Sequence, residues 1–177
     1  MILLSSCLDN IDDDRDEVES YFTLSVSGDA TQNYEGRAGF GTYEDPDSGV
    51  EVFIIDLNAQ TPNPGSGLRF VGKIDQIPGE QDFDVEEASL NEDHELILED
   101  LNEGKFIANY VTNDQEVSED NFIATDGVIS ITDREEEYLG GEFNLNAVSV
   151  PAEDDSMNIQ IEGEFQAPET EFEASSE

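Results

Sequence analysis

The stretch from Phe122 to Ala147 constrains the fold most, because apolar and polar residues alternate there with period two. The first run sets Ile129 and Ile131 on one face and Val128 on the other. In the second run, Leu139, Gly141, Phe143, Leu145 and Ala147 share one face, while Glu142, Asn144 and Asn146 share the other. Such alternation is typical of a strand with one buried and one solvent-exposed face. The charged link 133–137 is short, so we predict an antiparallel hairpin.

A third run, residues 159–167, repeats the second, and both contain Gly-Glu-Phe. We therefore predict a three-stranded meander at the C-terminal end. Further strands are expected at 21–28, 36–43, 50–57, 68–74 and 104–112, with a short edge strand at 82–85. Residues 96–98 favour a strand over a helical turn. About eight to ten short strands without a convincing helix predict an all-β fold, an antiparallel β-sandwich or an open barrel.

Charge is the strongest compositional signal, with 45 Asp and Glu against 6 Lys and Arg, a net charge of −39. The acids are spread along the chain, and no basic patch is available to meet phosphates, which argues against a nucleic-acid partner. Binding to anionic lipid heads by charge is disfavoured for the same reason. Three interpretations stay open: adaptation to high salt, a calcium-loaded surface, or an acidic protein at ordinary salt. The dispersed charge favours the first.

The N-terminal segment Leu4-Ser5-Ser6-Cys7 resembles a bacterial lipobox, in which the cysteine is lipidated and becomes the mature N-terminus. Cys7 is the only cysteine, so an internal disulfide is excluded. The acidic run that follows resembles the surface-export signal of Bacteroidota lipoproteins. A complete signal needs an apolar region of about 7–15 residues, and only six residues precede Cys7. Either the natural start lies upstream of Met1 or the chain is trimmed.

The strand pattern from Gly104 to Ala147 resembles domains of unknown function in small Bacteroidota lipoproteins. The resemblance implies a β-sandwich lipoprotein, anchored in the membrane through Cys7 at the outer membrane or cell surface, and implies no activity. We predict four segments: a signal-peptide remnant (1–6), a lipidated, disordered acidic tether (7–19), a β-sandwich domain (20–167) and a disordered acidic tail (168–177).

No residue pattern predicts catalysis, and we expect a protein that is not an enzyme. His94 is the only histidine and is expected at the surface, without the Gly-x-Ser-x-Gly context of a serine nucleophile. Among 45 acids, some pair always fits a glycosidase mechanism, so pairing carries no information. Glu142 and Glu164 recur in the Gly-Glu-Phe motif, and we interpret both as solvated strand positions.

Calcium is the best chemical hypothesis, because it takes about six to eight oxygen ligands from flexible loops. Candidate ligands are Asp45 and Asp47 in one acidic turn and Asp154 and Asp155 in another. No other cofactor is predicted.

A glycan-binding or adhesion module is the alternative function. It needs aromatic platforms, and the chain has no Trp, which leaves Tyr34, Tyr43 and Tyr110 if they are exposed. We therefore predict a non-catalytic, lipid-anchored envelope protein adapted to high salt, with an unknown glycan or protein partner.

Overall fold

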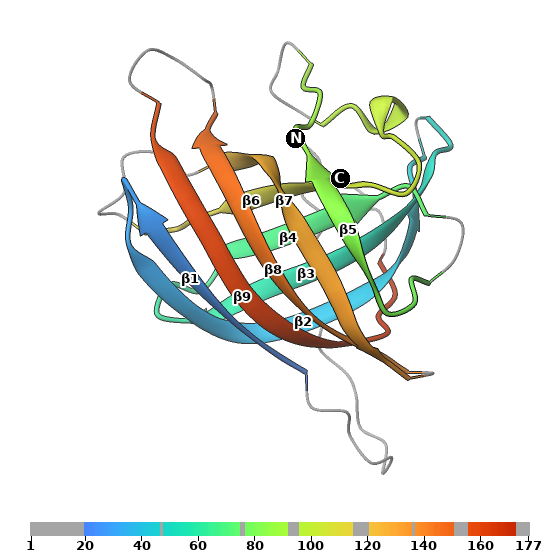
Figure 1. Ribbon diagram of the computed structural model, residues 1–177, viewed down its shortest axis with the longest axis horizontal. Coiled ribbons are helices and arrows are strands. Elements are labelled where there is room, and N and C mark those ends of the chain that lie inside the picture. Colours follow the sequence, from blue (N-terminus) through green and yellow to red (C-terminus); the bar gives the residue numbers. More distant parts are fainter. Residues whose placement is uncertain are drawn as a thin grey trace.

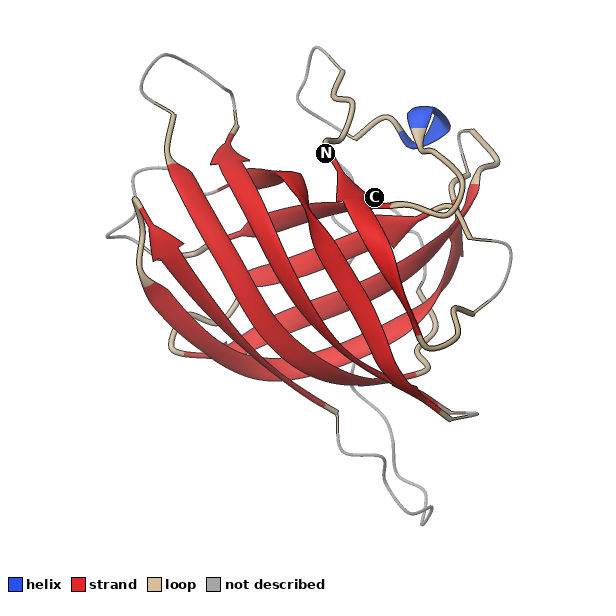
Figure 2. Ribbon diagram, in the orientation of Figure 1, coloured by secondary structure: helices blue, strands red, loops and turns tan. Residues whose placement is uncertain are grey.

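The computed structural model describes residues 20–46, 48–74, 77–91, 96–114, 121–135, 137–150 and 156–172. Within these ranges the chain forms nine strands and one turn of 3-10 helix, η1 (Leu98–Asp100). The strands are β1 (Tyr21–Gly28), β2 (Gln32–Glu44), β3 (Glu51–Thr61), β4 (Gly67–Gly72), β5 (Gln81–Glu86), β6 (Phe106–Val111), β7 (Asn121–Arg134), β8 (Tyr138–Ser149) and β9 (Asn158–Pro168). Figure 2 shows how completely strands dominate. The predicted all-β class is confirmed.

The strands form one sheet that closes on itself in the order β1-β2-β3-β4-β6-β5-β7-β8-β9, with β9 paired to β1. In Figure 1, β7, β8 and β9 form the near wall, and β3, β4 and β6 form the far wall. The pairings are antiparallel except for one parallel pair, Val85 with Phe106, between β5 and β6. β5 lies between β6 and β7 over only part of their length, and beyond it β6 pairs directly with β7, which closes the sheet. The sequence predicted a β-sandwich or an open barrel, and the structure is a barrel whose sheet is closed.

The predicted meander is confirmed as β7, β8 and β9. Ile129 pairs with Phe143, and Glu142 pairs with Glu164, so the inward and outward faces match the sequence pattern. The short strand predicted at 82–85 is confirmed as β5, which pairs along its length with β7 and meets β6 at the single pair Val85 and Phe106. One local prediction was wrong. Residues 96–98 do not form a strand: Leu96 makes only an isolated bridge with Leu90, and η1 begins at Leu98.

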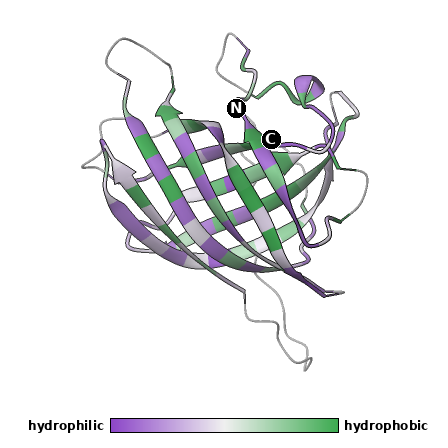
Figure 3. Ribbon diagram, in the orientation of Figure 1, coloured by the Kyte–Doolittle hydropathy of each residue, from purple (hydrophilic) through white to green (hydrophobic). Residues whose placement is uncertain are grey.

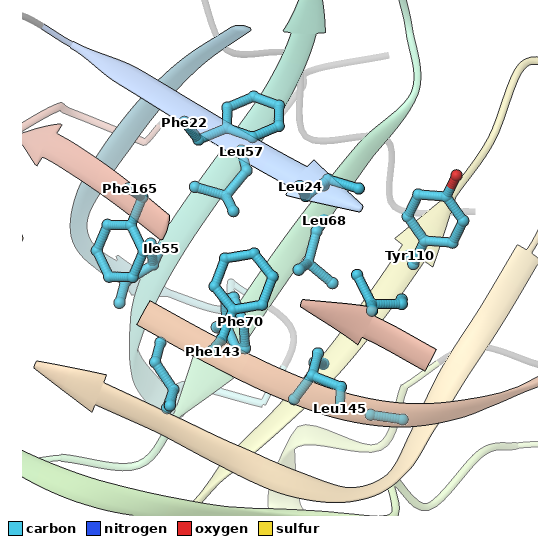
Figure 4. Packing of buried hydrophobic residues seen from close by; sticks show 14 of the residues in the cluster. Phe22, Leu24, Ile55, Leu57, Leu68, Phe70, Tyr110, Phe143, Leu145 and Phe165 are labelled. Carbon is cyan, nitrogen blue, oxygen red and sulfur yellow. The ribbon is translucent and has the colours of Figure 1, made fainter. Parts of the chain in front are cut away.

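The barrel interior is filled by aromatic and aliphatic side chains. The rings of Phe70 and Phe143 lie 5.3 Å apart in an edge-to-face arrangement, and those of Phe83 and Phe106 are equally close. Figure 4 shows Phe70 of β4 and Phe143 of β8 pointing toward one another from opposite walls. Along β7, β8 and β9, hydrophobic and hydrophilic bands alternate in Figure 3. Apolar burial of this kind is the main force that stabilises the closed sheet.

Inward-facing glycines allow the large rings to lie against the wall. A Cβ at Gly163 would press on the Thr23 carbonyl oxygen and lie 2.7 Å from Cζ of Phe143. A Cβ at Gly141 would lie 2.7 Å from Cζ of Phe165. The two Gly-Glu-Phe motifs therefore interlock, because each glycine makes room for the phenylalanine of the other.

A second hydrophobic cluster lies on the outside of the far wall. It contains Tyr43, Val52, Ile54, Val71, Leu101 and Ile107, with Phe172 packed against it. This cluster explains why residues 52–55 are apolar on both faces of β3. The structure places the first part of the predicted tail: Thr170 N–H donates to the Phe40 carbonyl at 2.7 Å, so residues 168–172 lie against β2, while residues 173–177 fall outside the described ranges. The apolar ring of Phe172 holds the acidic segment there.

Candidate functional site

A groove lies on the outer wall of the barrel, over β2, β1, β9, β8 and β7. Its volume is about 690 Å³. Two rows of outward side chains form its sides, and each row crosses the five strands through direct cross-strand partners. The first row is Glu35, Thr23, Glu164, Glu142 and Ser130, and the second is Asn33, Ser25, Glu162, Asn144 and Val128. We call this hollow the outer groove.

The floor of the outer groove is backbone. Between the two rows lie Tyr34, Leu24, Gly163 and Phe143, whose side chains, where present, face the core. Five strands at about 4.8 Å spacing make the groove about 19 Å long, and residues two apart in one strand set its sides about 7 Å apart. The floor's peptide groups already bond to neighbouring strands, so the groove offers side chains, and not a sheet edge, to an occupant.

The outer groove is acidic and lacks a neutralising group of its own. Glu35, Glu142, Glu162 and Glu164 line it, with no Lys or Arg among the lining residues. Among the described residues, ion pairs join Arg69 to Asp56 and Lys105 to Asp84, and neither pair lies at the groove. None of the four glutamates has a hydrogen-bonded side-chain partner within the described ranges. The groove therefore presents uncompensated negative charge.

Val128 is the one large apolar side chain exposed at the outer groove. It stands at the β7 end of the second row, with 39% of its surface accessible. The sequence pattern identified Val128 as facing away from the core. It did not associate Val128 with Thr23, Ser25 or Glu35, because the order of strands around the barrel is not contained in any single strand.

Of the four predicted calcium ligands, the structure describes Asp45 alone. Asp45 is 7% exposed, and its Oδ2 accepts hydrogen bonds from the backbone N–H of Ser48 (3.1 Å) and from the Ser48 hydroxyl. The turn is closed further by Gly49 N–H, which donates to the Asp45 carbonyl at 2.7 Å. This carboxylate stabilises the turn between β2 and β3.

The remaining predicted site residues fall outside the described ranges. They are Asp47, Asp154 and Asp155, the lipidation candidate Cys7, and His94. Calcium binding and lipidation stay predictions. In the described part of the chain, no group of three or more His, Cys, Asp or Glu side chains is placed to hold a metal ion.

The tyrosines considered for glycan stacking are buried. Tyr34, Tyr43 and Tyr110 are 1%, 6% and 3% exposed, so they do not form a platform on the outer surface. Tyr34 and Tyr110 instead meet inside one end of the barrel, where the Tyr34 hydroxyl lies 2.9 Å from the Thr112 hydroxyl. Burial is the main cause that raises the pKa of Tyr110, and the hydrogen bond with Tyr34 adds to it.

Within the described ranges, none of the helical segments has the length and apolar character needed to cross a membrane. Comparison with family models, curated proteins and solved structures finds no match to this chain.

Proposed function

We propose that this chain is a non-catalytic bacterial lipoprotein, exposed at the envelope or cell surface and adapted to high salt. In this proposal the barrel is a rigid scaffold whose outer wall contacts solvent and partners. The filled interior supports a scaffold role, because rings such as Phe70 and Phe143 occupy the space at its centre and leave the outer surface for binding. No residue is assigned a catalytic role.

Exposed acids without a cationic partner among the described residues carry the salt-adaptation part of the proposal. Glu142 faces Glu164, and Glu44 faces Glu51, as direct cross-strand partners. Like charges placed directly opposite destabilise a sheet. At about 1 M salt the Debye length falls to about 3 Å, which removes most of that cost. Such pairs therefore lower the free energy of unfolding little in concentrated salt and more in dilute buffer.

A thermal melt separates salt adaptation from calcium binding. The chain is heated in NaCl and in CaCl2 at matched ionic strength. The proposal expects the melting temperature to rise with ionic strength up to molar salt, equally for both cations. A rise at low millimolar calcium that sodium does not reproduce would overturn it in favour of a calcium site, since filling a site at 100 times its Kd adds about 2.7 kcal/mol.

The lipid anchor rests on the resemblance of Leu4-Ser5-Ser6-Cys7 to a lipobox. Its test is mass spectrometry of the peptide containing Cys7, isolated from membranes of a bacterial host that expresses the complete gene. The expected result is an acylated cysteine, and Cys7→Ser should move the protein to the soluble fraction. An unmodified Cys7 with unchanged membrane association of the serine variant would refute the anchor.

A further inference from the structure

The spacing of charges along the outer groove matches one kind of partner. Glu35 stands on β2, and Glu164 stands two strands away on β9, so about 9.6 Å separates their backbones. Val128 stands on β7, two strands beyond β9 in the same direction, but in the second row, on the other side of the groove from Glu35 and Glu164. Measured along the groove axis, an occupant lying centrally would meet negative charge, then negative charge, then an apolar contact, at nearly equal steps.

A polyproline II segment has this repeat. Its rise is about 3.1 Å per residue with three residues per turn, so side chains at i, i+3 and i+6 share one face at steps of about 9.3 Å. A β-strand would place positions i and i+3 on opposite faces. A polyproline II segment also needs no ladder of backbone hydrogen bonds, which suits a floor whose peptide groups already bond within the sheet.

The middle position of the groove is the most acidic. Glu164 has Glu142 as its direct neighbour on β8, and Glu162 lies two residues along β9 on the same outward face. These carboxylates are exposed and have no cationic partner among the described residues. A guanidinium at the middle position would relieve the repulsion between Glu142 and Glu164, and its planar donors suit carboxylates better than an ammonium does.

We propose that the outer groove binds an extended, basic polypeptide segment that carries basic side chains at positions i and i+3 and an apolar side chain at position i+6. The first basic side chain pairs with Glu35, and the second sits among Glu142, Glu162 and Glu164. The apolar side chain covers Val128. This assignment goes beyond the proposed scaffold function and does not depend on the lipid anchor.

Two labelled peptides of identical composition test the assignment by fluorescence anisotropy with the 177-residue chain. The matched peptide is Arg-Pro-Pro-Arg-Pro-Pro-Leu, and the scrambled peptide is Arg-Arg-Pro-Pro-Pro-Pro-Leu. Both carry the same charge, so general attraction to a chain of net charge −39 is equal for them. At about 0.15 M NaCl, the matched peptide should bind about tenfold more tightly, as expected for a few exposed ion pairs. Equal affinities, or no binding by either, would overturn the proposal.

Two triple variants separate the groove from the rest of the acidic surface. Glu35→Gln, Glu142→Gln and Glu164→Gln together remove the first-row charges. The control, Glu44→Gln, Glu51→Gln and Glu99→Gln, changes net charge equally and also removes one pair of facing glutamates. The groove variant should lose about tenfold in affinity for the matched peptide, whereas the control should stay within about twofold of the parent. Equal losses in both variants would show attraction to net charge alone and would refute the groove.

Folding of both variants is checked by their melting temperatures. If the groove variant does not fold, Val128→Ser in the parent chain replaces it. This substitution should lower the affinity for the matched peptide without changing net charge. An affinity unchanged by Val128→Ser would then count against the proposed position of the apolar side chain.

Discussion

Glu142 of β8 and Glu164 of β9 are direct cross-strand partners on the outer wall of the barrel, and both are exposed. No cation lies between them among the described residues. A sheet gains stability from opposite charges at such positions and loses it from like charges. The pair therefore lowers the stability of the sheet, and removing one of the two charges should raise it.

Glu142→Gln should raise the free energy of unfolding by about 0.2–1 kcal/mol in dilute buffer, because it removes this repulsion. The gain should disappear at about 1 M NaCl, where screening is nearly complete. Urea unfolding at both salt concentrations measures it. Glu35→Gln is the control, since its cross-strand partners, Thr23 and Thr61, are uncharged. A gain of equal size in the control would mean that net charge, and not the facing pair, sets the effect.

Phe143→Ala should lower the free energy of unfolding by about 3–5 kcal/mol, because it opens a cavity in the barrel core. Phe143 is 4% exposed and its ring lies near those of Phe70 and Phe165, at 5.3 Å and 6.4 Å. Val128→Ala on the outer wall is the control and should cost no more than about 0.5 kcal/mol. An unchanged melting temperature for Phe143→Ala would contradict the inward placement of this row.

The Asp56–Arg69 pair joins β3 to β4 on the outside of the far wall. Arg69 Nε donates to Asp56 Oδ1 at 2.9 Å, and Asn58 Nδ2 donates to Oδ2 at 2.6 Å. Arg69→Met should cost about 1–3 kcal/mol, because Asp56 is 6% exposed and would lose its counterion. Adding Asp56→Asn should recover part of that loss.

Lys105→Met is the matched control for the ion pair. Lys105 lies 3.3 Å from Asp84, but its side chain is 40% exposed and that of Asp84 is 72% exposed. Exposed pairs contribute about 0–1 kcal/mol. Equal losses from Arg69→Met and Lys105→Met in chemical unfolding would show that burial of Asp56 adds nothing.

The strands and their inward faces were predictable from the sequence, because alternation is a local property. Phe143 and Leu145 had to share a face once the strand was recognised. Closure of the barrel was not predictable, since the pairing of β9 with β1 joins residues more than a hundred positions apart. The outer groove was missed for the same reason: Glu35 and Glu164 come to lie on one wall, two strands apart, only after closure. The order of residues 168–172 was missed because acidic composition concealed the contribution of Phe172.

Phe172→Ala should reduce stability by about 1–2 kcal/mol, because a half-buried ring gives up part of the roughly 1.5–3 kcal/mol of full burial. The ring lies over Gly41 of β2, where a Cβ would come within 3.0 Å of its Cδ2. Glu171→Ala, an exposed neighbour, is the control. Hydrogen exchange of the Thr170 amide, which donates to Phe40, should accelerate in Phe172→Ala alone. Equal protection in both variants would show that the ring does not hold this segment.

The hydroxyl of Tyr138 should lose its proton at a higher pH than an ordinary tyrosine does. Its hydroxyl donates to Asp133 Oδ2 at 2.9 Å, and this hydrogen bond is the main cause that raises the pKa of Tyr138 to about 12. The folded state therefore holds the phenolic proton more tightly than the unfolded state, whose pKa is about 10. The stabilisation is complete below about pH 10 and is lost as the pH rises through about 12.

Difference spectrophotometry of the parent chain against Tyr138→Phe isolates this phenol from the other tyrosines. Asp133→Asn removes the carboxylate acceptor and should return the pKa of Tyr138 toward about 10. Tyr110 does not interfere, because burial raises its pKa in both proteins alike. A Tyr138 titration that is the same with and without Asp133→Asn would assign the raised pKa to the general negative charge of the chain. A shift confined to that variant would place its origin in this one hydrogen bond at the tip of the β7–β8 hairpin.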